Sequence, residues 1–171
     1  DCFAHNGRLL NKNINLPKTL AYLSMTEIRE IKTPEELDAI IPLFDAYRQF
    51  YRQQTDLAGA RQFLTDRLQH NESRIFAGYI TGEPRAFVQL YPFFTSVGMR
   101  RNWVLNDLFV EEAFRSRGLG RMLIQHVQVL CRKEDRAGIM LETEVTNQVG
   151  NALYKSCGFE LIGNNFYYWK A

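Results

Sequence analysis

The spacing of apolar residues in the first third of the chain predicts a short strand followed by an amphipathic helix. Residues 27–31 alternate weakly between apolar and polar side chains, as a strand does. Thr33-Pro34-Glu35-Glu36 has the form of a capping box, with proline at the first helical position. Pro42 could break or kink this helix. Its buried face is expected to carry Leu37, Ile40, Ile41, Phe44, Tyr47 and Tyr51.

The pattern after Asp56 predicts a second helix and then a hairpin. Leucine, alanine and phenylalanine recur at helical spacing from Asp56 to about Asn71. Two strand-like runs follow, at residues 74–80 and 85–91, and the turn-forming residues between them indicate a hairpin. Residues 92–101 lack a clear period, so we expect a loop there that either lies over a ligand or packs its own aromatic side chains.

The second half of the chain predicts a central strand, a helix and a mixed sheet. Residues 103–110 are rich in strand formers and lead, through two glycines, into an amphipathic helix. The remaining predicted elements are a strand over 139–145, a short helix over 148–156 closed by Gly158, and strands over 159–162 and 166–170. This order predicts an α+β fold around a mixed central sheet.

Composition narrows the class of protein to which the chain can belong. The 171 residues are 46% hydrophobic, which suits one domain with its own core, and no apolar run reaches the roughly 18 residues that a membrane helix needs. Cys2, Cys131 and Cys157 are widely spaced, so we expect neither disulfides nor a metal site, and a cytoplasmic protein. We therefore expect no metal and no membrane partner.

The first 24 residues show neither a strand nor a helix period, and Met25 looks like a natural start. We expect residues 1–24 to be a leader or expression-derived segment and residues 25–171 to be one domain. Removing Arg8, Lys12, Lys18 and Asp1 from 21 basic and 19 acidic residues leaves 18 of each. Nucleic-acid binders usually carry a basic excess, so no nucleic-acid partner is expected.

The candidate chemistry begins at Arg115-Ser116-Arg117-Gly118-Leu119-Gly120, directly after the central strand. A glycine turn that opens a helix presents free N–H groups and the positive end of the helix dipole to an anion. No Lys-Ser or Lys-Thr follows, as a Walker loop requires, and Leu123 stands where a Rossmann fingerprint needs its third glycine. The pattern therefore indicates a different pyrophosphate cradle.

With this motif, the chain resembles the GNAT superfamily of acyl-CoA N-acyltransferases. A second signature of that family follows at the expected distance: Asn147, then Ala152-Leu153-Tyr154, then Gly158-Phe159. The resemblance runs over essentially all of residues 27–170. It implies an α/β/α sandwich whose central mixed sheet is mostly antiparallel, with acetyl-CoA as cosubstrate.

The resemblance also implies which positions contact the coenzyme. The turn would hold the pyrophosphate, the preceding strand would pair with the pantetheine arm, and the tyrosine would protonate the departing thiolate. The expected coenzyme-binding residues are Leu108, Phe109, Val110, Arg115, Ser116, Arg117, Gly118, Leu119, Gly120, Arg121, Asn147, Asn151 and Tyr154.

The implied activity is N-acetylation of a primary amine, small, polyamine-like or lysine-like, by direct attack in a ternary complex. The amine's proton needs an acceptor, and Asp107 and Glu144 are the candidates, with Tyr154 as the acid. Strand alternation places Asp107 and Phe109 on the face opposite Asn106. The segment around Asn106 resembles members that act on polyamines or histone tails, although some of those carry glutamate there.

Two further expectations stay open at this point. A non-catalytic acyl-CoA sensor or interaction module on the same fold is the alternative to an enzyme. The resemblance also favours a homodimer, and the aromatic run 166–169 could form either core or a dimer contact.

Overall fold

The computed structural model describes residues 26–163 and 165–171, so the expected leader lies outside the described residues. Within them, one mixed sheet has the strand order β1-β2-β3-β4-β5, antiparallel except for the parallel pair β4-β5. The strands are β1 (Thr26–Glu30), β2 (Arg74–Ile80), β3 (Glu83–Thr95), β4 (Arg100–Val110) and β5 (Ile139–Met140).

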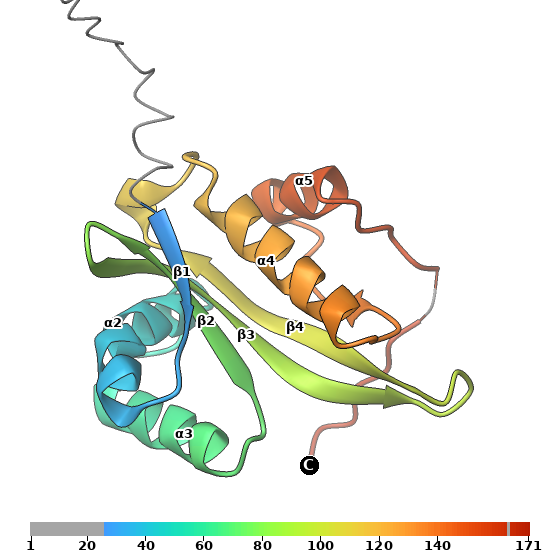
Figure 1. Cartoon of the computed structure of the whole chain (residues 1–171), viewed down its shortest axis with the longest axis horizontal. Helices are drawn as coiled ribbons and strands as arrows, with labels where there is room; N and C mark the ends of the chain where they lie inside the picture. The colour runs from blue at the N-terminus through green and yellow to red at the C-terminus, as the bar shows by residue number, and fades with distance from the viewer. Residues whose placement is uncertain (1–25, 164) are drawn as a thin grey trace, which may run out of the picture.

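Helices cover both faces of this sheet (Figure 1). On one face lie α2 (Pro34–Phe50) and α3 (Leu57–Gln69), and on the other lie α4 (Leu119–Lys133) and α5 (Gln148–Ser156). A single 3-10 turn, η1 (Glu112–Phe114), connects β4 to the segment before α4. The expected α/β/α arrangement with a mostly antiparallel mixed sheet is confirmed.

The start of α2 follows from the capping box in the sequence. The Glu36 N–H donates to the Thr33 hydroxyl at 3.3 Å, and the Thr33 N–H donates to the Glu36 carboxylate at 3.1 Å. The helix continues through Pro42 to Phe50, so proline does not break it.

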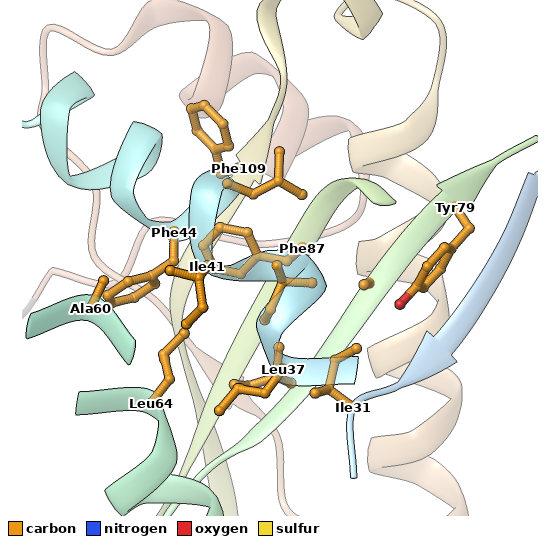
Figure 2. Close-up of a cluster of buried hydrophobic side chains, with 13 residues drawn as sticks. Ile31, Leu37, Ile41, Phe44, Ala60, Leu64, Tyr79, Phe87 and Phe109 are labelled. Carbon is orange, nitrogen blue, oxygen red and sulfur yellow. The ribbon is translucent and has the colours of Figure 1, made fainter. Parts of the chain in front are cut away.

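Two apolar clusters, one on each face of the sheet, hold the layers together. Figure 2 shows the cluster on the α2 side, where Leu37, Ile41 and Phe44 meet Phe87 of β3. Phe109 of β4 joins the same cluster. The α4 side gathers Leu119, Leu123, Ile124 and Val127 against the other face. None of the helices in the described ranges is long and apolar enough to cross a membrane.

The loop expected over residues 92–101 is instead the end of a long hairpin. Pro92 pairs with Trp103, and the Trp103 N–H donates across to Gly138 on the far side of β4 at 3.0 Å. Pro92 therefore stands in a pair without ladder bonds, where its missing N–H costs nothing. This explains why a strand runs through a proline.

The prediction of three strands near the C-terminus is also wrong. Only residues 139–140 of the predicted 139–145 strand pair with β4, and residues 159–162 and 166–170 form no strand. Propensity alone does not make a strand, because a strand needs a partner for its ladder. The short helix at 148–156 and the left-handed Gly158, with φ of 84°, are as predicted.

Candidate functional site

The site begins where β4 parts from β5. Asp107 pairs with Gln89, whereas Leu105 pairs with Leu90, so Asn106 is an extra residue in β4. Pairing with β5 ends at Val104, just before this bulge. A bulge bends and twists its strand. The last four residues of β4 consequently have no strand beside them on the β5 side among the described residues.

Ladder geometry shows which backbone groups face that opening. The Glu111 N–H donates to the Arg85 carbonyl at 2.9 Å, so by alternation Phe109 also directs its backbone towards β3. Leu108 and Val110 direct theirs away from β3, into the opening. Of the three positions expected to pair with a pantetheine arm, these two have the backbone groups to do so, while the Phe109 side chain packs under α2.

The expected anion cradle has the required local geometry at the start of α4. Ser116 and Gly118 have φ of 60° and 86°, and Gly118 is the helix N-cap without a side-chain capping bond. The first bond of the helix runs from the Met122 N–H to the Gly118 carbonyl. The N–H groups of the first helical turn therefore lack a capping side chain, and an anion can take that place.

Gly120 has a packing role that the motif did not reveal. A Cβ there would stand 3.2 Å from Leu153 of α5 and 3.6 Å from Val110 of β4. The missing side chain lets α5 pack close against the start of α4. Gly118 has open space around its Cα, so its positive φ is what favours glycine there.

The three arginines of the motif differ in what they contact. Arg115 donates from Nε to the Val110 carbonyl at 3.0 Å, with its guanidinium near the rings of Phe50 and Phe109. Arg117 lies near the Phe114 ring. Arg121 donates to the Ser156 hydroxyl and carbonyl at 2.8 and 3.1 Å, so its side chain ties α4 to the end of α5.

Asn147 and Asn151 organise the loop before α5. Asn147 caps α5 by accepting from the Gly150 N–H at 3.0 Å, and its amide donates to Thr143 at 3.0 Å. Asn151 donates to the carbonyls of Glu144 and Asn147 at 3.0 and 2.8 Å. Both asparagines thus hold the loop after β5 against the first turn of α5.

Asp107 is a carboxylate buried beside the bulge, on the α2 side of the sheet. Only 4% of its surface is exposed. Burial raises the pKa of Asp107 from its ordinary 3.8 to about 6, although hydrogen bonds from Tyr47 and Asn106 partly offset that effect. The Asn106 amide donates to it at 3.1 Å. A carboxyl group with this pKa is mostly ionised at neutral pH and can still take a proton.

Tyrosines surround this carboxylate. The Tyr47 hydroxyl has one proton and two acceptors within reach, the Asn106 carbonyl at 3.4 Å and the Asp107 carboxylate, and its ring meets that of Tyr51 at 5.1 Å. Burial and then the nearby Asp107 raise the pKa of Tyr47 and of Tyr91. Burial and then Tyr51 raise the pKa of Tyr154 to about 12. All of these hydroxyls stay protonated at neutral pH, and among them only Tyr47 hydrogen-bonds to the Asp107 carboxylate.

Glu144, the other carboxylate expected to act as base, is much more exposed than Asp107. It follows β5 in a segment that forms no strand, and nearly half of its side chain is exposed. Arg52 approaches it at 3.5 Å and the Thr146 hydroxyl donates to it at 3.4 Å. Burial and then the negative charge of Glu144 raise the pKa of Tyr51. Glu144 is thus a partly exposed electrostatic neighbour of Tyr51.

Two hollows flank these residues. A cavity of about 310 Å³ lies between the end of α2 and the start of α5, where Tyr51, Glu144 and Asn147 line it. A larger groove of about 660 Å³ runs between α2, the start of β3 and the end of β4, bounded by Phe50, Phe109 and Arg115. Among residues 26–163 and 165–171, no His, Cys, Asp and Glu side chains cluster to hold a metal ion.

Sequence reasoning missed Tyr47 and Tyr51 as site residues, because both fit the buried face of α2. The sequence nevertheless contained a signal that could have identified them. Two tyrosines one helical turn apart bring two hydroxyls that need partners once they are buried. That requirement is met only where a polar group, here Asp107, lies under the helix.

Known proteins share this architecture. Residues 37–159 match the family described as "Acetyltransferase (GNAT) family". The chain is 42% identical over 133 residues to YhfO of Bacillus subtilis (strain 168), an uncharacterized N-acetyltransferase, a match that covers 78% of this chain and 89% of that protein.

Solved structures agree with that match. The crystal structure of a probable acetyltransferase superposes with a TM-score of 0.81 at 32% identity, covering 85% of this chain and 98% of the other. An aminoglycoside acetyltransferase from an uncultured soil metagenomic sample superposes with a TM-score of 0.71 at 14% identity, over 86% of this chain and 98% of the other, which shows the shared fold alone.

Proposed function

This chain belongs to the GNAT family of acetyltransferases, and from that premise we propose that it transfers an acetyl group from acetyl-CoA to the primary amine of a cationic acceptor. The observation that carries the proposal is Asp107. It is a buried carboxylate with a pKa raised to about 6, beside the bulge where β4 leaves β5. General bases are most effective when their pKa lies near the working pH.

The residues present fit acetyl-CoA, which supplies an activated acetyl group when bound. The uncapped first turn of α4, opened by Gly118, suits its pyrophosphate. Leu108 offers its N–H and carbonyl to the pantetheine arm and Val110 offers its N–H, because the Val110 carbonyl accepts from Arg115; one of these N–H groups can also hold the thioester carbonyl oxygen as negative charge develops on it. Arg115 and Arg117 add positive charge near the same turn.

Asp107 takes the proton that the acceptor must lose. An alkylammonium has a pKa of about 10.4, so it arrives protonated at neutral pH. Asp107 accepts that proton, directly or through water, and the freed nitrogen attacks the acetyl carbonyl in a ternary complex. Tyr47 and Asn106 hold the carboxylate in place while it is ionised.

Tyr154 acts as the acid that protonates the departing thiolate. The C–S bond breaks as the new N–C bond forms, and the thiolate takes the Tyr154 hydroxyl proton. Solvent then reprotonates the phenolate. A pKa of about 12 keeps this hydroxyl protonated before the reaction.

The acceptor is proposed from the chemistry of the site. Asp107 and Glu144 supply negative charge, and Tyr51 supplies an aromatic ring beside them, which together favour a cation. None of the relatives described above is named for polyamines or histone tails, so that narrower resemblance is not carried into the proposal. We place the reaction in the cytoplasm, on the widely spaced cysteines.

The experiment measures free thiol released from acetyl-CoA in the presence of polyamines, amino acids, aminoglycosides and lysine peptides, together with acetyl-CoA binding by calorimetry. The proposal expects amine-dependent thiol release with at least one acceptor. Tight coenzyme binding without turnover for any amine would contradict it and would favour the alternative, an acyl-CoA sensor.

A further inference from the structure

A row of uncharged side chains lies beside Asp107, on the α2 side of the sheet. Gln89 pairs directly with Asp107, and paired residues of neighbouring strands share a face. Side chains two residues apart on one strand also share a face, so the row continues along β3 and its partners on β4. We call it the aromatic row, and its members are Tyr91, Phe93 and their respective partners Val104 and Asn102.

The helices leave much of the aromatic row open. Tyr91 and Val104 are half-buried, and Phe93 is 43% exposed. None of these three side chains belongs to the two apolar clusters that hold the layers together. Figure 1 shows the hairpin of β3 and β4 extending past α2 and α3. Aromatic rings that stay partly exposed beside a buried carboxylate form a surface on which a ligand can pack.

The charges around the aromatic row favour a ligand with one amine and an uncharged body. Burial and then the negative charge of Asp107 raise the pKa of Tyr91, so this carboxylate acts on the row from one end. The other charges that act on Tyr91 belong to Arg67 and Glu72, which form an ion pair with each other. A second ammonium group placed on the row would therefore lose water without gaining a free carboxylate.

The spacing along β3 sets the length of the ligand. Two residues of a strand span about 7 Å, so Tyr91 follows the pair of Asp107 and Gln89 by that distance. Phe93 follows by about 13 Å. A two-carbon chain between an amine and an aromatic ring bridges the first interval and brings the ring onto Tyr91, with Phe93 beyond it.

Building on the proposed function, we propose that the acceptor is an arylalkylamine, with its amine at Asp107 and its ring against Tyr91 and Phe93 of the aromatic row. Val104, the partner of Tyr91, supplies apolar surface beside the ring. Aromatic rings in contact stabilise one another beyond the area that they bury. An alkylamine without a ring makes the contact with Asp107 and leaves the row in water.

The test measures binding of three amines by calorimetry in the presence of coenzyme A, which has no acetyl group to transfer. The readout is therefore independent of turnover. Phenethylamine should bind about threefold to tenfold more tightly than butylamine or putrescine, as an aromatic contact provides. Phe93→Ala should remove most of that advantage and leave butylamine binding unchanged. Unchanged affinity for coenzyme A checks that the variant is folded.

Phe94→Ala is the matched control. Phe94 is the next residue on β3, so its side chain points to the opposite face of the sheet, and it is 63% exposed. This variant should bind all three amines as the wild type does. Equal binding of the three amines by the wild type would overturn the inference. So would an equal loss in both variants, or no loss in either, as when the C-terminal segment covers the row instead.

Thiol release from acetyl-CoA with the same three amines separates this inference from the proposed function. Preferential binding of phenethylamine without thiol release would contradict the proposed function and support the aromatic row as a binding surface. Thiol release as efficient with butylamine as with phenethylamine would support the proposed function and overturn the inference.

Discussion

Replacing Asp107 with asparagine should make the protein more stable at neutral pH while it removes the proposed base. The physical reason is the cost of holding a charge in a site that is 4% exposed. The pKa of Asp107 is about 6 in the folded protein, against an ordinary value of 3.8. Each pKa unit corresponds to about 1.4 kcal/mol, so the charged form destabilises the fold by up to about 3 kcal/mol.

The sign of the pH dependence follows from that shift. The unfolded chain loses the Asp107 proton near pH 4, whereas the folded chain keeps it until about pH 6. The contribution of Asp107 to stability is therefore favourable at low pH and is lost as pH rises through this window. Asp107→Asn should match the wild type near pH 4 and exceed it by up to about 3 kcal/mol at pH 7.5.

Urea unfolding at a series of pH values measures this difference, and Asp45→Asn provides the matched control. Asp45 is equally buried, at 3% exposed, but hydrogen bonds from the Asp56 N–H and Thr55, each under 3 Å, outweigh burial and lower its pKa. Asp45→Asn should destabilise the protein at pH 7.5 by about 1–3 kcal/mol, with less effect in acid. If both variants lost stability alike at pH 7.5, the reasoning about Asp107 would be refuted.

The remaining predictions concern the tyrosines and the helix start. Tyr154→Phe should reduce kcat at least hundredfold with unchanged acetyl-CoA affinity, measured by thiol release and calorimetry, and an unchanged kcat would remove its role as acid. Tyr47→Phe removes a hydrogen bond that lowers the pKa of Asp107, so the acidic limb of the rate profile should move to higher pH. An unchanged limb would show that Tyr47 does not lower the pKa of Asp107. Gly120→Val should cost about 1–3 kcal/mol in urea unfolding because its side chain meets Leu153, and a variant of wild-type stability would contradict that packing role.

Local signals in the sequence predicted the helices well. The capping box at Thr33 and the glycine at 158 act through bonds within a few residues, so their geometry can be read from neighbours in the chain. The same holds for the uncapped start of α4 at Gly118. Those features are local, and the sequence contains all of their partners.

Features that depend on distant partners were harder to predict. The strand through Pro92 exists because Trp103 turns its N–H to Gly138, a contact that no local pattern shows. The strand at 139–145 shortens to two residues because β4 bends away after Asn106. The pairing of Tyr47 with Asp107 spans 60 positions, so the site's tyrosines looked like ordinary core until the fold was known.

The proposed role of Asp107 is tested most directly by the pH dependence of kcat/KM for the best amine acceptor, in the wild type and in Asp107→Asn. The wild type should rise with pH to a plateau through an apparent pKa near 6, the value that burial gives Asp107. Asp107→Asn should lose that limb and most of its rate. A limb near pH 6 that persists unchanged in Asp107→Asn would contradict the assignment of this carboxylate as the base.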